Sequence, residues 1–162
     1  MSQRLEIVSA ERVREELIKL LCGRAPRRGV EIMVDTGLAD VVLPEVPALK
    51  LETDEAHHHK DVYQHSLTVM EQAAELETGP DGPVPSPDLV LRLAALLHDV
   101  GKPATRRFGP DGAVTFRHHE TVGAKIVKKR MKALRFDNDT IAAVTRLVAV
   151  SYTHLTLPTN RE

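Results

Sequence analysis

The stretch LRLAALLHDVGKP, residues 91–103, carries the strongest signal for the fold of this chain. Apart from Arg92, its first seven residues are apolar, so a helix made of them has almost no polar face and belongs in the centre of a helical bundle. Asp88 is a suitable N-cap for this helix, which runs into the polar pair His98-Asp99. If this helix is buried, the His98 imidazole and the Asp99 carboxylate at its end need hydrogen-bond or charge partners, because an unpaired charge is costly to bury.

Apolar residues recur at helical spacing on both sides of this stretch. The expected helices span residues 10–22, 26–37, 38–43, 61–76, 88–97, 119–134 and 137–148. Gly101 and Pro103 are expected to break the central helix. Residues 105–116 are the only strand-like segment, and the turn at residues 109–112 (GPDG) predicts one small β-hairpin. We therefore expect an all-α helical bundle with one small β-hairpin, preceded by a short helical connector.

The composition is that of one globular domain, with 42% hydrophobic and 28% charged residues in a chain of 162. The net charge of -1 excludes a generally basic nucleic-acid binder, and the aromatic content of 3% argues against folds that stack bases on several rings. A single cysteine, Cys22, excludes an intramolecular disulfide and a Cys-rich zinc site. The chain lacks an apolar run near the ~20 residues of a membrane span, and its start lacks a signal peptide's apolar stretch, so we expect it in the cytoplasm.

Three predicted helices bring imidazole or carboxylate groups to the edge of the core. His65 lies on the apolar face of the helix 61–76, the pair His98-Asp99 ends the central helix, and His119 opens the helix after the hairpin. A bound metal ion satisfies a buried aspartate and several neutral imidazoles together. The alternative is that His65 is a hydrogen-bonded core residue and that His98-Asp99 is a charged cap.

Six segments resemble a known family in sequence and in order. His65 and the pair His98-Asp99 resemble the HD superfamily of metal-dependent phosphohydrolases. The wider resemblance is to the C-terminal half of bacterial CCA-adding tRNA nucleotidyltransferases of the poly(A) polymerase family, especially actinobacterial ones. It covers the chain up to Val148 and rests on RLEIVSAERVREELIKLL, GLADVVLPE, HKDVYQHSL, LRLAALLHDVGKP, TRRF and HHETVGAK.

The resemblance implies a helical connector over residues 1–46 and a helical HD domain over residues 47–149. In that family nucleotide addition belongs to a separate N-terminal head, so we expect that this chain cannot add CCA by itself, and that tRNA is the partner of the full-length protein. The triplet Asp137-Asn138-Asp139 has the D-x-D spacing of such a head but no Gly-Ser turn before it. An N-cap is the better interpretation.

The resemblance also implies a metal site. By position, His65, His98 and Asp99 correspond to metal ligands, and His119 to a further ligand where a second metal binds. Mixed imidazole and carboxylate ligands suit Mn, Co, Ni, Fe or Zn better than Mg. The implied reaction is hydrolysis of phosphomonoesters or cyclic phosphodiesters, with Asp99 and Lys102 as catalytic residues.

Several basic side chains are candidates for substrate contact. Lys102, Arg106 and Arg107 are placed to contact a phosphate, and His59 is an outside candidate. For the two arginines, a charged strand edge that opposes aggregation is an equal alternative. One face of the helix 119–134 is also basic, which indicates a solvated surface or, as the alternative, an RNA-backbone contact. This face consists of Lys125, Lys128, Lys129, Lys132 and Arg135.

Residues 150–162 break with the preceding helical pattern. The string VSYTHLTLPT at 150–159 resembles a one-frame translation of a transposase-type sequencing adapter, so we interpret 150–162 as adapter-derived. A divergent natural C-terminus is the alternative. In the family a last metal ligand follows the position of Val148, so we expect this chain to bind metal weakly, and a tail that is extended or irregular.

Two functions remain open at this stage. One is a fragment with a metal-dependent phosphohydrolase site that acts on small phosphate esters. The other is a non-catalytic HD-fold module that positions tRNA or forms a homodimer. Metal content and hydrolysis of a chromogenic phosphodiester separate them.

Overall fold

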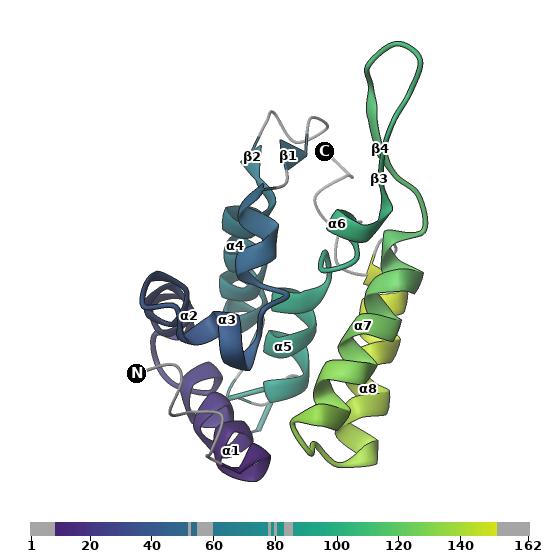
Figure 1. Ribbon diagram of the computed structural model, residues 1–162. Coiled ribbons are helices and arrows are strands. Elements are labelled where there is room, and N and C mark those ends of the chain that lie inside the picture. Colours follow the sequence, from purple (N-terminus) through teal and green to yellow (C-terminus); the bar gives the residue numbers. More distant parts are fainter. Residues whose placement is uncertain are drawn as a thin grey trace.

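A computed structural model describes residues 9–51, 53–54, 60–77, 79, 81–82 and 86–151 (Figure 1). The elements before the central helix are α1 (Ala10–Leu21), α2 (Pro26–Asp35), α3 (Leu38–Val42), the 3-10 helix η2 (Pro47–Leu51), β1 (Thr53–Asp54), β2 (Lys60–Asp61) and α4 (Val62–Glu75). From the central helix onward they are α5 (Leu89–Leu97), α6 (Lys102–Thr105), β3 (Arg106–Phe108), β4 (Val114–Phe116), α7 (His119–Ala133) and α8 (Asn138–Ala149).

The central position of α5 is confirmed. It packs against α1, α4 and α8, and every residue from Arg92 to Leu97 is buried. The helices α7 and α8 pack on each other and close one side of the bundle (Figure 1). No helix within the described ranges combines the length and apolarity that crossing a membrane requires.

Four side-chain N-caps are present in the structure, and those of the helices that start near Asp88 and Asp137 were predicted. The side chains of Ser9, Asp61, Asp88 and Asp137 each accept a hydrogen bond from a backbone amide two or three residues on, at 2.8–3.3 Å. Each cap is worth about 1 kcal/mol and satisfies an amide that has no partner inside the helix. The bond from the Thr140 amide to Asp137 confirms that the D-x-D triplet begins a helix.

The strand prediction needs two corrections. The hairpin exists as β3 paired antiparallel with β4, but Thr105 belongs to α6, and Pro103 lies in the first turn of α6, where its missing amide is not needed. Pro103 therefore starts a helix and does not break one. A second antiparallel pair, β1 with β2, was not predicted, because strands of two residues leave no alternating pattern.

The end of α8 coincides with the boundary set for the adapter-like segment. Val150 follows the helix as its C-cap, and Ser151 is buried and helical, so the one described residue beyond the cap does not fit the expected extended or irregular tail. The expectation of an extended or irregular tail concerns residues that, after Ser151, lie outside the described part of the chain.

A buried ion pair joins the connector to the bundle. Arg92, the one charged residue of α5, forms two hydrogen bonds to Glu77, at 2.7 and 2.8 Å. Its remaining nitrogen donates to the carbonyl groups of Leu21 and Gly23, at the end of α1. Because the Arg92 and Glu77 side chains are largely shielded from water, these bonds fix α1 and the segment after α4 to the central helix.

We expect Glu77→Gln to remove an acid-sensitive part of the stability. Hydrogen bonds from Arg92 lower the pKa of Glu77 from 4.5 to about 2, and its side chain is 2% exposed. Because the folded-state pKa is depressed, this stabilisation is present above pH 4.5 and is lost as the pH falls towards 2. The difference in unfolding free energy between wild type and variant should shrink by about 3 kcal/mol over that range, measured by urea denaturation. Glu75→Gln, at an exposed position, is the control; an equal effect there would contradict the assignment.

Candidate metal centre

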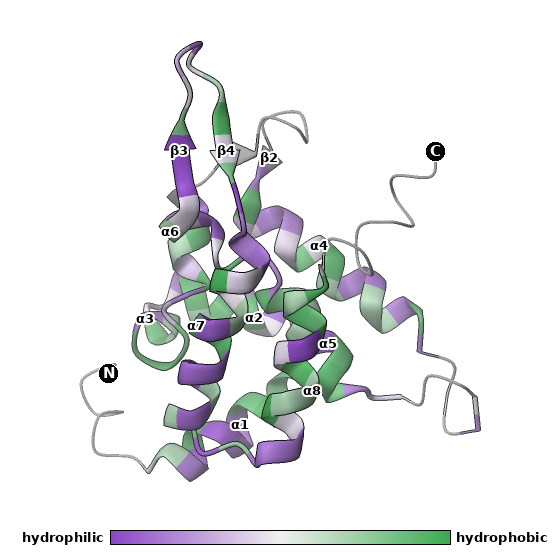
Figure 2. Cartoon of the chain, turned by 90° about the vertical axis from the view of Figure 1, so that its right-hand side faces the viewer, coloured by the Kyte–Doolittle hydropathy of each residue, from purple (hydrophilic) through white to green (hydrophobic). Residues whose placement is uncertain are grey.

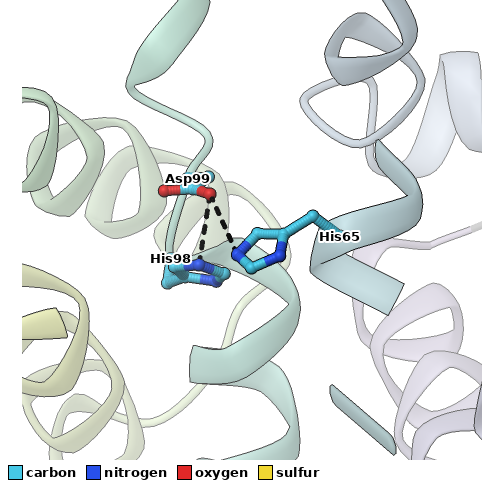
Figure 3. A group of neighbouring side chains, drawn as sticks. All are labelled: His65, His98 and Asp99. Carbon is cyan, nitrogen blue, oxygen red and sulfur yellow. Dashed lines mark ion pairs between the residues drawn. The ribbon is translucent and has the colours of Figure 1, made fainter. Parts of the chain in front are cut away.

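Three side chains from two neighbouring segments converge at the end of the central helix. His65 comes from the second turn of α4, His98 is the C-cap of α5, and Asp99 follows it (Figure 3). One ligand atom of each residue lies within 4.8 Å of the others. His98 and Asp99 are buried, whereas the His65 side chain is 23% exposed, so the cluster is open to solvent on the His65 side.

The distances suit a shared cation. Asp99 Oδ2 lies 3.2 Å from His98 Nε2 and 3.9 Å from His65 Nε2. An ion held about 2 Å from each ligand atom separates its ligand atoms by roughly 3–4 Å.

The orientation of His98 favours metal ligation. Its Nδ1 lies 2.6 Å from the Ala95 carbonyl oxygen, and a proton held there would leave the Nε2 lone pair available to a metal ion bound between His98 and Asp99. Within the described residues, the buried atoms His98 Nε2 and Asp99 Oδ2 have no hydrogen-bond partner. Unsatisfied buried polar atoms are costly, and a divalent ion would satisfy both, so the residues present fit a metal.

The electrostatics keep the aspartate ionised. Burial alone raises the pKa of Asp99, but the His98 and His119 rings and the Lys102 ammonium outweigh it and hold the pKa well below the usual range. Burial likewise lowers the pKa of His98, but the Asp99 carboxylate overcomes this and raises it. The carboxylate is therefore anionic, which is the form that binds a cation.

His119 contacts the other oxygen of the same carboxylate. Its Nε2 lies 3.2 Å from Asp99 Oδ1, and its Nδ1 lies 3.1 Å from the Phe116 carbonyl oxygen. His119 thus contacts Asp99 but is not one of the three residues, His65, His98 and Asp99, that could hold one metal ion together. Glu120, 3.4 Å from His119 Nδ1, was missed by the sequence analysis, and only its position beside His119 could have indicated it.

Lys102 is buried against the cluster and is not an exposed basic residue. Its ammonium lies 3.4 Å from Asp99 Oδ2 and 5.3 Å from the centre of the Phe116 ring. Arg106 and Arg107 are exposed on β3. His59 lies outside the described residues.

A backbone contact holds α7 against the cluster. Gly101, two residues after Asp99, lies directly against the first turns of α7, where a Cβ atom would fall 2.0 Å from the His119 carbonyl oxygen. Gly123 faces it from α7. The absence of side chains at this crossing is what allows His119 to reach Asp99.

Two family profiles match this chain. The profile described as "Probable RNA and SrmB- binding site of polymerase A" matches residues 1–49, and the HD domain profile matches residues 62–156. The HD match therefore extends past Val150, into the segment interpreted as adapter-derived.

Similar curated proteins have names from tRNA 3′-end synthesis. The chain is 38% identical over 139 residues to a CC-adding tRNA nucleotidyltransferase of Thermus thermophilus, covering 85% of this chain and 30% of the relative. It is 37% identical over 153 residues to an A-adding tRNA nucleotidyltransferase of Deinococcus radiodurans, covering 94% and 33%. A multifunctional CCA protein of Vibrio vulnificus is 33% identical over 140 residues, covering 85% and 31%. The chain thus spans about a third of the length of these relatives.

Proposed function

The chain belongs to the HD domain family, and on that premise we propose that it is the part of a tRNA nucleotidyltransferase that carries a metal-dependent phosphohydrolase site. The RNA-binding profile over residues 1–49 and the tRNA nucleotidyltransferase names of the relatives support tRNA as the partner of the longer protein. In this proposal nucleotide addition is the task of another part of that protein.

The observation that carries the proposal is the unsatisfied pair of buried atoms, His98 Nε2 and Asp99 Oδ2, beside His65. These three residues would hold a divalent ion, with Mn, Co, Ni, Fe or Zn better suited than Mg to mixed imidazole and carboxylate ligands. When bound, such an ion supplies an acidified water molecule and polarises a phosphoryl oxygen.

The other residues of the cluster have separate tasks. His119 Nε2, bonded to Asp99 Oδ1, holds the carboxylate so that Oδ2 faces His65 and His98. Where a second ion binds, His119 is placed to be its ligand. Lys102 offers a positive charge to a phosphate oxygen, in surroundings where its side chain is 6% exposed and charge interactions are weakly screened.

The test is metal titration by calorimetry with Mn²⁺, together with hydrolysis of bis(p-nitrophenyl) phosphate. We expect His65→Ala to weaken metal binding by about 100-fold or more, because one of three protein ligands is lost. His118→Asn is the matched control: His118 is exposed at a left-handed backbone position that Asn tolerates. Equal metal affinity in wild type and His65→Ala, or hydrolysis that survives EDTA, would contradict the proposal.

One observation favours the non-catalytic alternative. The Lys102 ammonium, 3.4 Å from Asp99 Oδ2, already supplies a positive charge where a metal ion would. If Lys102 serves as a permanent counter-charge, the fold needs no metal and acts as a module that positions tRNA or forms a homodimer. In that case Mn²⁺ titration gives no heat of binding, wild type does not hydrolyse bis(p-nitrophenyl) phosphate, and Lys102→Met lowers stability.

A further inference from the structure

The hairpin β3–β4 projects from the helical body beside α6 and the start of α7 (Figures 1 and 2). Its register pairs Arg106 with Phe116 and Phe108 with Val114. Directly opposed residues of an antiparallel pair share a face, and so do residues two apart on one strand. Arg106, Phe108 and Phe116 therefore lie on one face of the hairpin, which we call the hairpin platform, with Val114 between the two rings.

The Phe108 ring at the outer end of the platform is exposed to solvent, and the Arg106 guanidinium lies over it. Phe108 is 70% exposed, the highest value among the exposed large hydrophobic side chains of the described residues. The Arg106 guanidinium carbon lies 5.5 Å from the centre of that ring. An exposed ring flanked by arginine is the arrangement that binds unpaired nucleic-acid bases, since every base has a face that can stack and a phosphate that attracts the cation.

The charge of the hairpin complements a polyanion. Residues 106–117 contain Arg106, Arg107 and Arg117 and a single carboxylate, Asp111, in the turn. If the hairpin carried only exposed arginines, they could be explained as charges that keep a strand edge from aggregating. The exposed Phe108 does not fit that role, because an exposed apolar ring increases the tendency to aggregate.

The inner ring connects the platform to the metal centre. Phe116 lies under the Lys102 ammonium, which is 3.4 Å from Asp99 Oδ2. Given the ~3.3 Å rise per strand residue, the path from Phe108 through Phe116 and Lys102 to Asp99 is roughly 15 Å long. At ~3.4 Å per stacked nucleotide, that distance is longer than one nucleotide and corresponds to a short oligonucleotide.

We infer that the hairpin platform binds a base of single-stranded RNA whose terminal phosphate reaches the Asp99 cluster. The inference rests on the proposed function, because hydrolysis of the phosphate requires the metal site. It deepens that function by naming the end of an RNA strand, and not a free nucleotide, as the substrate class. Phe108 supplies the stacking face, Arg106 the charge beside it, and Lys102 the contact to the terminal phosphate.

The binding experiment does not require hydrolysis. A fluorescein-labelled hexaadenylate is titrated with the full chain in EDTA, and anisotropy gives its affinity. We expect Phe108→Ala to weaken binding about tenfold and Phe108→Trp to retain it, because stacking needs a ring and not a particular side chain. The matched control is Leu76→Ala, which removes a side chain that is 63% exposed at the end of α4 and should leave binding unchanged.

The kinetic experiment uses a hexanucleotide and a mononucleotide, both ending in a 2′,3′-cyclic phosphate, with Mn²⁺ present. We expect wild type to prefer the hexanucleotide in kcat/KM, and Phe108→Ala to lose about tenfold of that preference through KM. If Phe108→Ala loses RNA binding but wild type shows no hydrolysis, the hairpin platform is supported as an RNA-binding surface and the phosphohydrolase proposal is refuted. Unchanged RNA affinity in Phe108→Ala overturns the inference. If that variant also dissociates a dimer, the platform is instead an interface between two copies.

Discussion

Asp99→Asn should abolish binding of divalent metal and reduce phosphoester hydrolysis by at least about 1000-fold. Asp99 Oδ2 is the atom that both imidazoles approach, at 3.2 Å from His98 and 3.9 Å from His65. A neutral amide is a much poorer ligand for a divalent cation than a carboxylate. Because the substitution removes the one anion of the cluster, it should act on binding as well as on turnover. Metal titration by calorimetry and hydrolysis of bis(p-nitrophenyl) phosphate measure the two effects.

The control for this variant is Asp139→Asn. Asp139 is exposed in the first turn of α8, so its substitution changes the net charge by the same amount far from the cluster. In a longer protein that also carries a nucleotidyltransferase head, Asp99→Asn should leave nucleotide addition intact. Phosphodiesterase activity at the wild-type level in Asp99→Asn would show that Asp99 is not a ligand. A thermal melt of both variants separates a lost site from a lost fold.

Much of the fold follows from local signals in the sequence. The apolar run of α5 predicts a central helix, and Asp61, Asp88 and Asp137 predict the starts of three helices, because these signals act over a few residues. The same logic places His65 and His98 at the edge of the core. Their convergence on Asp99 was expected from the resemblance to the HD superfamily, and the described geometry agrees with it, whereas their role as ligands stays a prediction.

The features that were not predicted depend on partners distant in the sequence. Arg92 interrupts an apolar helix and gives no local sign that Glu77 and the end of α1 will satisfy it. Lys102 was predicted to contact a phosphate, but no local signal indicates that its ammonium lies beside Asp99 and the Phe116 ring. Burial of a charge is set by tertiary contacts, and periodicity carries no information about them.

Gly101 is the clearest case of a residue whose structural role differs from its predicted one. From the sequence, Gly101 was expected to break the central helix. Its backbone is right-handed, with φ of -79°, so any residue could adopt this conformation. Glycine is needed here for space, since a Cβ atom would lie 2.0 Å from the His119 carbonyl oxygen and 2.7 Å from the Gly123 amide nitrogen.

Gly101→Ala should therefore destabilise the protein by about 3 kcal/mol or more, at the upper end of the effects of overpacking. The atoms that the new methyl group meets are backbone atoms of α7, so no rotamer change relieves the clash, and the helix must move. That movement carries His119 away from Asp99 Oδ1, where it now lies at 3.2 Å. For a chain of this size the melting temperature should fall by roughly 10 °C, measured by circular dichroism.

Gly123→Ala provides the graded control on the opposite side of the same crossing. Its Cβ atom would lie 3.3 Å from the Gly101 amide nitrogen and 3.6 Å from its Cα, contacts that a small shift relieves. Alanine also favours the helical state of α7 by about 1 kcal/mol relative to glycine. We therefore expect Gly123→Ala to change the melting temperature by no more than a few degrees. If both variants melt together with wild type, α7 does not need the close crossing at Gly101, and another contact must hold His119 beside Asp99.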